Sequence, residues 1–217
     1  MNLYDLVIFD LDGTILDTSE GIVSALKHTI AEFGFSIPPS EVLNTFIGPP
    51  VQDSLANYFK LDSIEAAEMA KLFRDRYKDN DLLLATPYEG IFQIMQTLLD
   101  HGMQLAIATY KREDYAIRLL HHFSFDSYTA IMHGSDFDGV MKKQDIIRLC
   151  ITEAGVADYR RIVMVGDTYH DADGADTLGV DFIGVTYGFG YTSIQDIKCS
   201  RMVGCADIPN DILKFVL

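Results

Sequence analysis

The sequence predicts an α/β protein with a doubly wound parallel sheet and an inserted all-helical domain, and three observations lead to this prediction. Short runs of Val, Ile, Leu and Phe recur along the chain and are apolar throughout, which is typical of strands that are buried on both faces. Helical patterns separate these runs, as in doubly wound proteins. One long interval near the amino terminus shows only helical patterns and therefore indicates an insertion.

Five apolar runs are expected to form the buried strands of the sheet. They are residues 6–10 (LVIFD), 105–109 (LAIAT), 128–133 (YTAIMH), 162–167 (IVMVGD) and 182–187 (FIGVTY). Three of these runs end in a residue that can carry chemistry, namely Asp10, Thr109 and Asp167. Because the carboxyl ends of the strands form the ligand crevice of an open α/β sheet, we expect these three residues to converge.

Helices are expected where apolar residues return every three or four positions. The segment before Gly102, a plausible C-terminal stop, places five apolar residues on one face: Ile91, Ile94, Met95, Leu98 and Leu99. Residues 114–123 and 143–155 have the same pattern, and the second of these segments is expected to end near Gly155.

The interval from about Asp17 to Leu84 contains helical patterns and no convincing strand. Its last helix is expected to begin with Ser63 as the N-cap. We therefore expect an α/β core of residues 1–16 and 83–217 and a helical domain of residues 17–82. The chain crosses between them twice, and the two crossings could act as a hinge.

The composition excludes several classes of function. The 32 Asp and Glu outnumber the 17 Lys and Arg, which gives a net charge of −15, whereas binding to nucleic acid polymers or anionic membranes requires concentrated positive charge. No apolar run approaches the roughly 20 residues that span a bilayer. Cys150, Cys199 and Cys205 form no CxxC pair, and their odd number argues against a disulfide framework or a structural zinc site. A cytoplasmic protein is the simplest expectation.

Two carboxylates follow the first expected strand in the segment FDLDGT. Asp10 and Asp12 stand two positions apart, Gly13 permits a tight turn, and Thr14 offers a hydroxyl. One such carboxylate can act as a nucleophile and the other as a general acid and base. A plain Asp-Gly turn would explain an isolated motif of this kind, and it is the expected explanation of DFDG at residues 136–139.

Four carboxylates follow the fourth expected strand in VGDTYHDADGAD: Asp167, Asp171, Asp173 and Asp176. Crowded acids repel one another unless they face water, pair with cations or hold a metal. In a helix over residues 171–178, Asp173 and Asp176 would be turned from Asp171 by about 160° and about 140°. We therefore expect these last two to be solvated helix acids.

Four of these segments, in this order, resemble the motifs of the haloacid dehalogenase-like hydrolases. They are DLDGT at 10–14, AT at 108–109, the lysine at the head of KQDII and GDTYHD at 166–171. FDLDGTILDT, FIGPP, PYEGI, IATYK and GVTYGFG further resemble the branch that contains phosphoglycolate phosphatases and 5'-nucleotidase-like proteins. The resemblance covers essentially the whole chain and implies a Rossmann-like core with the helical insertion as a cap domain.

The resemblance also implies catalytic roles. Asp10 would attack phosphorus and become an aspartyl-phosphate, and Asp12 would protonate the leaving oxygen and then activate water. Thr109 and the backbone amide of Tyr110 would hold the transferring phosphoryl group, and Lys143 would neutralise charge that the nucleophile and the phosphate share.

The resemblance implies a Mg²⁺ ion held by Asp10, the carbonyl of Asp12 and Asp167, with Asp171 supporting it directly or through water. Metal and lysine together would offset the repulsion between a carboxylate and a phosphate dianion.

The lysine of the third motif has two candidates, because Lys142 and Lys143 are adjacent and Gln144 replaces the proline that often follows it. The match of KQDII to a helix start favours Lys143. Lys111 either contacts substrate or is an exposed loop cation.

Further residues are expected to bind substrate: Gly13, Thr14 and Tyr110 in the core, and Ile47 and Gly48 in the FIGPP segment of the cap domain. Two adjacent prolines stiffen this segment, which the resemblance puts over the active site. The cap domain is expected to close over the site and exclude water.

The expected function is a Mg²⁺-dependent phosphatase, monomeric or homodimeric, that hydrolyses a small phosphate monoester of the phosphoglycolate or nucleoside 5'-monophosphate type. Three alternatives remain open: a phosphomutase of the β-phosphoglucomutase type, a pyrophosphatase or phosphonatase on the same scaffold, and a non-catalytic binding protein. A binding protein would be expected to lack a motif carboxylate, and Asp10, Asp12, Asp167 and Asp171 are all present.

Overall fold

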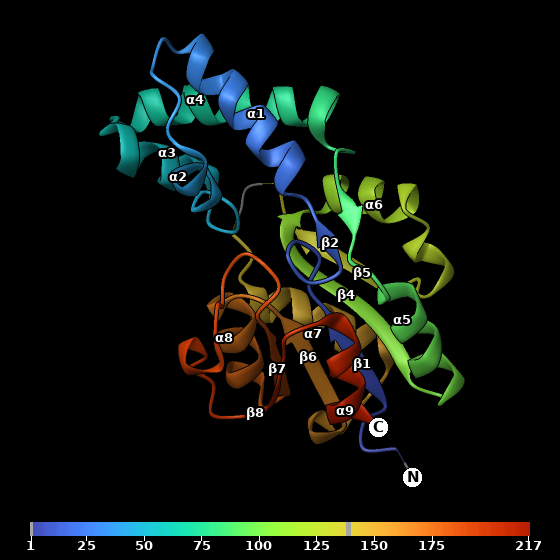
Figure 1. Cartoon of the computed structure of the whole chain (residues 1–217). Helices are drawn as coiled ribbons and strands as arrows, with labels where there is room; N and C mark the ends of the chain where they lie inside the picture. Colours follow the sequence, from blue (N-terminus) through green and yellow to red (C-terminus); the bar gives the residue numbers. More distant parts are fainter. Residues whose placement is uncertain (1, 138–139) are drawn as a thin grey trace. The chain divides into compact units, whose positions relative to one another are not determined.

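The computed structural model describes residues 2–137 and 140–217, and the chain divides into two compact units. The first unit contains Met1–Asp17 and Pro87–Leu217, and the second contains Thr18–Thr86 (Figure 1). The second boundary lies later than the expected residue 82, because Leu84 O accepts a hydrogen bond of 3.0 Å from Gly21 N and so belongs with the second unit.

The first unit is built around a six-stranded sheet in which every neighbouring pair of strands is parallel. The strand order is β5-β4-β1-β6-β7-β8. The strands are β1 (Leu6–Phe9), β4 (Gln104–Arg112), β5 (Met132–Ser135), β6 (Ile162–Gly166), β7 (Asp181–Val185) and β8 (Met202–Ala206). The predicted α/β fold with a parallel sheet is confirmed.

The third expected strand was placed too early in the sequence. The run 128–133 was expected to be extended, but β5 begins only at Met132. The reason is the Thr129 side chain, whose hydroxyl donates to Leu105 O at 2.6 Å and accepts from Ile131 N at 3.0 Å. This hydroxyl therefore replaces part of the strand ladder.

Five helices cover the sheet in the described part of the first unit. They are α5 (Ile91–Asp100), α6 (Glu113–His122), α7 (Lys143–Ala154), α8 (Tyr169–Leu178) and α9 (Leu213–Val216). Buried side chains of α7 and α8 share one apolar core with β1 and β6, while Figure 1 shows α5 and α9 on the other side of the sheet. Gly155, with φ at +70°, ends α7 as predicted.

The second unit consists of helices and the loops that connect them, and only its last residue belongs to a strand. Its elements are α1 (Ser19–Glu32), α2 (Ser40–Asn44), α3 (Val51–Phe59), α4 (Ser63–Arg76) and a π-helical turn η1 (Tyr77–Asp81). Two short strands, β2 (Leu16–Asp17) and β3 (Thr86–Pro87), pair where the chain leaves and re-enters the first unit.

The N-cap of α4 differs from the prediction. Asp62, not Ser63, is the cap, and its carboxylate accepts from Ile64 N at 2.8 Å and Glu65 N at 2.9 Å. The Glu65 carboxylate accepts in turn from Asp62 N, which completes a capping box.

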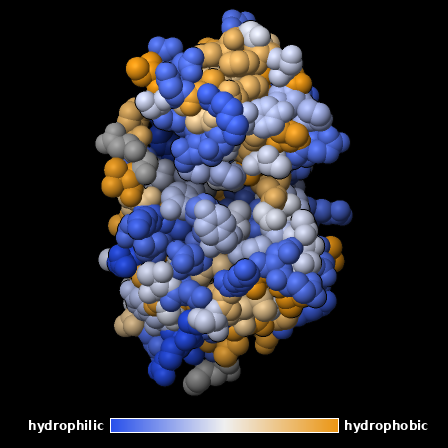
Figure 2. Space-filling model, turned by 90° about the vertical axis from the view of Figure 1, so that its left-hand side faces the viewer, coloured by the Kyte–Doolittle hydropathy of each residue, from blue (hydrophilic) through white to orange (hydrophobic). Residues whose placement is uncertain are grey.

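The described surface shows no membrane-spanning feature and no disulfide. None of the helices in the described ranges is both long and apolar enough to cross a bilayer. On the face shown in Figure 2, hydrophobic residues form separate patches among hydrophilic ones. Cys150, Cys199 and Cys205 are free thiols, in agreement with the expectation from their number. The second half of the expected turn DFDG, residues 138 and 139, lies outside the described residues.

Candidate active site

Three neighbouring strands carry the expected site residues of the first unit. The central strand β1 lies between β4 and β6. Asp10 directly follows β1, Thr109 lies near the carboxyl end of β4, and Asp167 directly follows β6. Asp10 N donates to Val165 O at 2.9 Å, so parallel pairing continues to the point at which the carboxylates begin. The convergence expected from the strand ends is therefore present.

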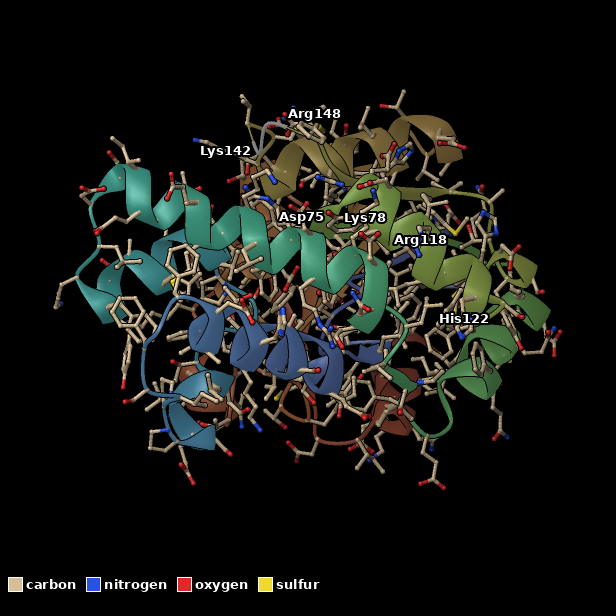
Figure 3. The ribbon with its side chains drawn as sticks, turned by 90° about the horizontal axis from the view of Figure 1, so that it is seen from above. Asp75, Lys78, Arg118, His122, Lys142 and Arg148 are labelled. Atoms are coloured by element: carbon tan, nitrogen blue, oxygen red, sulfur yellow. The ribbon has the colours of Figure 1, made fainter. Side chains whose placement is uncertain are left out.

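A buried lysine connects two of the expected carboxylates. Lys143 Nζ lies 2.5 Å from Asp10 Oδ1 and 2.6 Å from Asp171 Oδ1, and all three side chains are almost fully buried. Lys142, labelled at the start of α7 in Figure 3, is exposed. Of the two adjacent lysines, only Lys143 lies among the carboxylates.

The charges in this cluster are coupled. Burial raises the pKa of Asp10, and the negative charges of Asp171 and Asp12 add to the rise, whereas the Lys143 ammonium opposes it. Burial alone would lower the pKa of Lys143, but the carboxylates of Asp10 and Asp171 outweigh it and raise that pKa. The lysine therefore stays protonated, and its charge favours the ionised Asp10 that a nucleophile requires.

Asp167 is fully buried beside this cluster. Its Oδ2 accepts hydrogen bonds from Phe189 N at 2.7 Å and Gly190 N at 3.2 Å. Its Oδ1 has no hydrogen-bond partner within the described residues. Burial raises the pKa of Asp167, and the charges of Asp10 and Asp171 raise it further. A cation beside Oδ1 would satisfy this atom and offset the repulsion.

The donor set fits a magnesium ion. Asp10, Asp167 and Asp171 each offer a carboxylate oxygen within 4.8 Å of the others, and Mg²⁺ prefers oxygen ligands. Asp167 Oδ1 is buried without a hydrogen-bond partner among the described residues, so a bound cation would stabilise this atom. Asp171 is already engaged, because its Oδ2 accepts from Thr168 N at 3.0 Å and from the Thr168 hydroxyl at 2.7 Å.

Asp12 is paired with a lysine that the sequence left undecided. Lys111 Nζ lies 2.9 Å from Asp12 Oδ1, and the two side chains are only 8% and 16% exposed. Of the two alternatives for Lys111, the exposed loop cation is therefore wrong, and contact with substrate stays a prediction.

The turn after β1 brings its backbone against Asp167. Gly13 has φ at +79°, and a Cβ at this position would lie 2.3 Å from Asp167 Oδ2, so only glycine fits. Thr14 is fully buried, and its carbonyl accepts a hydrogen bond of 3.0 Å from the Tyr187 hydroxyl. The expected contacts of Gly13 and Thr14 with substrate remain predictions.

The end of β4 supplies a second group of expected site residues. Thr109 is buried, and its hydroxyl oxygen accepts from Lys111 N at 3.1 Å. The Tyr110 ring lies edge-on to the ring of His170, with centroids 4.9 Å apart. Ile47 and Gly48 belong to the second unit, between α2 and α3, and their role in substrate binding stays a prediction.

The two remaining acids of α8 differ from each other. Asp173 is exposed, as expected of a solvated helix acid. The same expectation is wrong for Asp176, whose carboxylate accepts from Ser200 N at 2.9 Å, the Ser200 hydroxyl at 2.8 Å and Arg201 N at 3.1 Å. Asp176 therefore joins α8 to the segment that leads into β8.

The sequence analysis missed the backbone donors to Asp167. They come from the segment GFG after β7, where two glycines approach the site closely. A Cβ at Gly188 would lie 2.2 Å from Gly13 O, and a Cβ at Gly190 would lie 2.4 Å from Asp167 O. The pair of glycines was the available signal, because glycine marks positions at which another backbone approaches.

Buried carboxylates, with a lysine between two of them, lie at the carboxyl edge of a doubly wound sheet, and this arrangement is typical of a hydrolase that acts on phosphate esters. The model of the haloacid dehalogenase-like hydrolase family matches residues 7–185. The chain belongs to this family.

The matches to individual relatives cover nearly the whole chain. A 5'-nucleotidase of Pseudomonas aeruginosa is 34% identical over 207 residues, which cover 94% of this chain and 92% of that protein. A phosphoglycolate phosphatase of Agrobacterium fabrum is 34% identical over 203 residues, which cover 90% and 85% of the two chains. The crystal structure of a Clostridium difficile protein, 31% identical, matches with a TM-score of 0.88 over 99% of both chains.

Proposed function

We propose that the protein is a Mg²⁺-dependent phosphatase of small phosphate monoesters that works through an aspartyl-phosphate on Asp10. The observation that carries this proposal is the buried Lys143 ammonium between Asp10 and Asp171. The positive charge of Lys143 favours the charged form of Asp10 at the carboxyl end of the central strand, where the nucleophile must approach an anionic ester. The names of the two curated relatives favour phosphoglycolate or a nucleoside 5'-monophosphate as substrate.

In the first step an Asp10 oxygen attacks the phosphorus of the ester. The bond between phosphorus and the alcohol oxygen breaks as the bond to Asp10 forms. Asp12, which has taken up a proton from solvent before this step, transfers that proton to the departing oxygen. The products of this step are the free alcohol and a phosphorylated Asp10.

In the second step water attacks the phosphorylated Asp10. Asp12, now a carboxylate, accepts a proton from the water, which attacks phosphorus. The bond between phosphorus and Asp10 breaks, inorganic phosphate leaves, and both carboxyl groups return to their initial states. Asp12 therefore serves as acid and then as base at a single position.

The remaining residues of the cluster orient the phosphoryl group. Lys143 holds positive charge beside Asp10 in both steps, and Thr109 with the Tyr110 amide stands at the neighbouring strand end. A Mg²⁺ ion would be held by Asp10, the carbonyl of Asp12 and Asp167, with Asp171 in support. When bound, it supplies positive charge against the phosphate oxygens.

The test of this proposal is Asp10→Asn, with Asp173→Asn as the matched control. Asp173 is an exposed acid of the same unit. Asp10→Asn should lower turnover of p-nitrophenyl phosphate by about 10³-fold or more, because covalent transfer to the side chain becomes impossible. Asp173→Asn should keep the activity of the unchanged protein. Circular dichroism of both variants checks that the fold is retained.

Two outcomes would contradict the proposal. Substantial activity of a folded Asp10→Asn variant would remove the nucleophile assignment. Failure of the unchanged protein to release phosphate from any member of a panel would remove the phosphatase assignment; the panel comprises p-nitrophenyl phosphate, phosphoglycolate, nucleoside monophosphates, sugar phosphates and pyrophosphate. Isomerisation of a sugar phosphate that requires a sugar bisphosphate primer, without net release of phosphate, would identify a phosphomutase instead.

A further inference from the structure

We infer that Lys111 is a positioning residue that orients the Asp12 carboxyl group, which carries the proton in the first step, for proton transfer to the leaving oxygen. The inference deepens the proposed function and rests on it. Lys111 thus acts on the reaction through Asp12 and does not itself contact the reacting atoms.

The first observation is that Lys111 makes two contacts with expected catalytic residues. Its backbone N donates to Thr109 Oγ1 at 3.1 Å, and its Nζ lies 2.9 Å from Asp12 Oδ1. Both residues of the first contact belong to β4, so this contact holds the two side-chain-bearing positions together within the strand. The second contact reaches from β4 to the turn after β1. Lys111 therefore ties Asp12 to the strand end that bears Thr109.

The second observation is the burial of this ion pair. The Lys111 side chain is 8% exposed, whereas Lys214, paired with Asp211 at 2.5 Å, is 68% exposed. An exposed pair of the second kind contributes little, because water screens it and both side chains stay mobile. A lysine is rarely buried unless it is paired, and burial restricts both partners to one geometry.

The third observation is the division of charge between two lysines. Lys143 pairs with Asp10 and Asp171, while Lys111 pairs with Asp12. The negative charge of Asp12 acts on Asp10, so the two carboxylates repel each other. Lys111 attracts the Asp12 carboxylate toward itself, which opposes any rotation that the repulsion would otherwise drive.

The chemical consequence depends on the leaving group. A general acid must lie within hydrogen-bond reach of the oxygen that it protonates. Alkoxides are poor leaving groups and need this proton, whereas p-nitrophenolate leaves readily without it. Loss of Lys111 should therefore slow the hydrolysis of alkyl phosphates far more than that of p-nitrophenyl phosphate.

The experiment measures kcat/KM for p-nitrophenyl phosphate, phenyl phosphate and phosphoglycolate with Lys111→Met and Lys111→Arg. Lys111→Met should lose about 10²-fold on phosphoglycolate and less than about threefold on p-nitrophenyl phosphate. Phenyl phosphate should fall between them. Lys111→Arg should recover part of the loss on phosphoglycolate because it restores the positive charge. Lys214→Met, the exposed lysine of a similar pair, should behave as the unchanged protein for all three esters.

A double variant separates positioning from folding. Asp12→Asn needs no cation, so Asp12→Asn with Lys111→Met leaves no unpaired charge in this pair. If Lys111 acts only through Asp12, adding Lys111→Met to Asp12→Asn should change kcat/KM less than about twofold for every ester. This comparison remains valid even if Lys111→Met alone does not fold.

Each contrary result has a distinct meaning. Equal losses on all three esters would show that Lys111 contacts the phosphoryl group, and unchanged rates would show that it has no part in the reaction; either outcome overturns the inference. An unchanged protein that hydrolyses none of the three esters and no other member of the panel named above would instead overturn the proposed function, so the two failures are distinguishable.

Discussion

At the scale of single residues, the acids of the segment 165–176 show how partners decide the role of a carboxylate. Asp167 accepts two backbone amides, Asp171 contacts Lys143 and Thr168, and Asp173 faces solvent. Asp176 binds the backbone of the segment that leads into β8. Four similar side chains in one short segment therefore have four different environments.

Asp176→Ala should lower the free energy of unfolding by about 2 kcal/mol at about pH 7, because two backbone amides of residues 200 and 201 lose a charged acceptor. Urea denaturation measures this difference. Burial alone would raise the pKa of Asp176, but hydrogen bonds from Ser200 and Arg201 outweigh it and hold this pKa below its ordinary value. The stabilisation is thus complete above the unfolded pKa of about 3.9 and is lost as the pH falls through the lower folded pKa.

The control for this prediction is Asp173→Ala, which removes an exposed acid of the same helix. Its effect should stay within about 0.5 kcal/mol at every pH. A cost for Asp176→Ala that is equally small, or one that grows as the pH is lowered, would contradict the explanation from hydrogen bonding.

The sequence predicts the direction of these side chains better than their partners. Helical spacing correctly turned Asp173 and Asp176 away from Asp171. It could not show that residues 199–201, more than twenty positions later, pack against Asp176 but not against Asp173. The same limit applies to Lys111, whose partner Asp12 lies on another strand end. Motif order brought Asp10, Asp167 and Lys143 into one predicted site, and the structure shows that their side chains lie close together; these residues follow strands or begin a helix.

At the scale of elements, strands were predictable where the sheet buries both faces. β1 and β6 are apolar throughout and lie at the centre of the sheet. The edge strand β8 was missed, since its sequence MVGCA is only partly buried and contains a glycine at its centre. The start of β5 was misplaced because a threonine hydroxyl substitutes for backbone pairing, and apolar patterns carry no information about such a contact.

The second unit contains a buried polar contact that links its elements. Asp81, at the end of the π-helical turn η1, accepts from Arg76 Nε at 2.7 Å and from the Ser24 hydroxyl at 3.0 Å. Arg76 ends α4, and Ser24 belongs to α1. A Cβ at Gly21 would lie 2.3 Å from Asp81 O, so α1 approaches this turn as closely as glycine allows. The widened turn places Asp81 between the two helices.

Asp81→Ala should destabilise the second unit by about 3 kcal/mol, since it leaves the Arg76 guanidinium without its carboxylate. Thermal unfolding followed by circular dichroism should show a lower midpoint. Asp79→Ala is the matched control, because Asp79 belongs to the same turn and is exposed; its midpoint should shift little. Equal midpoints for the two variants would show that the buried ion pair does not hold α1 and α4 together.

At the scale of the whole molecule, a chain with a net charge of −15 is expected to bind an anion. The site itself concentrates four carboxylates, Asp10, Asp12, Asp167 and Asp171, against two lysines. With all four carboxylates ionised, four negative and two positive charges give the cluster a net charge of −2, which one divalent cation would balance. Binding of a phosphate dianion should therefore depend on prior binding of the metal.

This charge balance gives a prediction for metal removal that does not depend on turnover alone. EDTA should stop hydrolysis of p-nitrophenyl phosphate, and added Mg²⁺ should restore it. Mg²⁺ should also raise the midpoint of thermal unfolding, because at about 100 times its Kd a ligand stabilises the folded state by about 2.7 kcal/mol. The effect should require Asp167, whose Oδ1 has no hydrogen-bond partner among the described residues.

Asp167→Asn separates the metal from the fold. Its amide oxygen can still accept the hydrogen bonds that Phe189 N and Gly190 N donate, and it removes one of the repelling buried charges. Without metal, this variant should therefore unfold at a temperature no lower than the unchanged protein. With Mg²⁺ its midpoint should not rise, whereas that of Asp173→Asn should rise as in the unchanged protein. An equal Mg²⁺ shift in Asp167→Asn, or full activity of the unchanged protein in EDTA, would show that the carboxylate cluster is not the magnesium site.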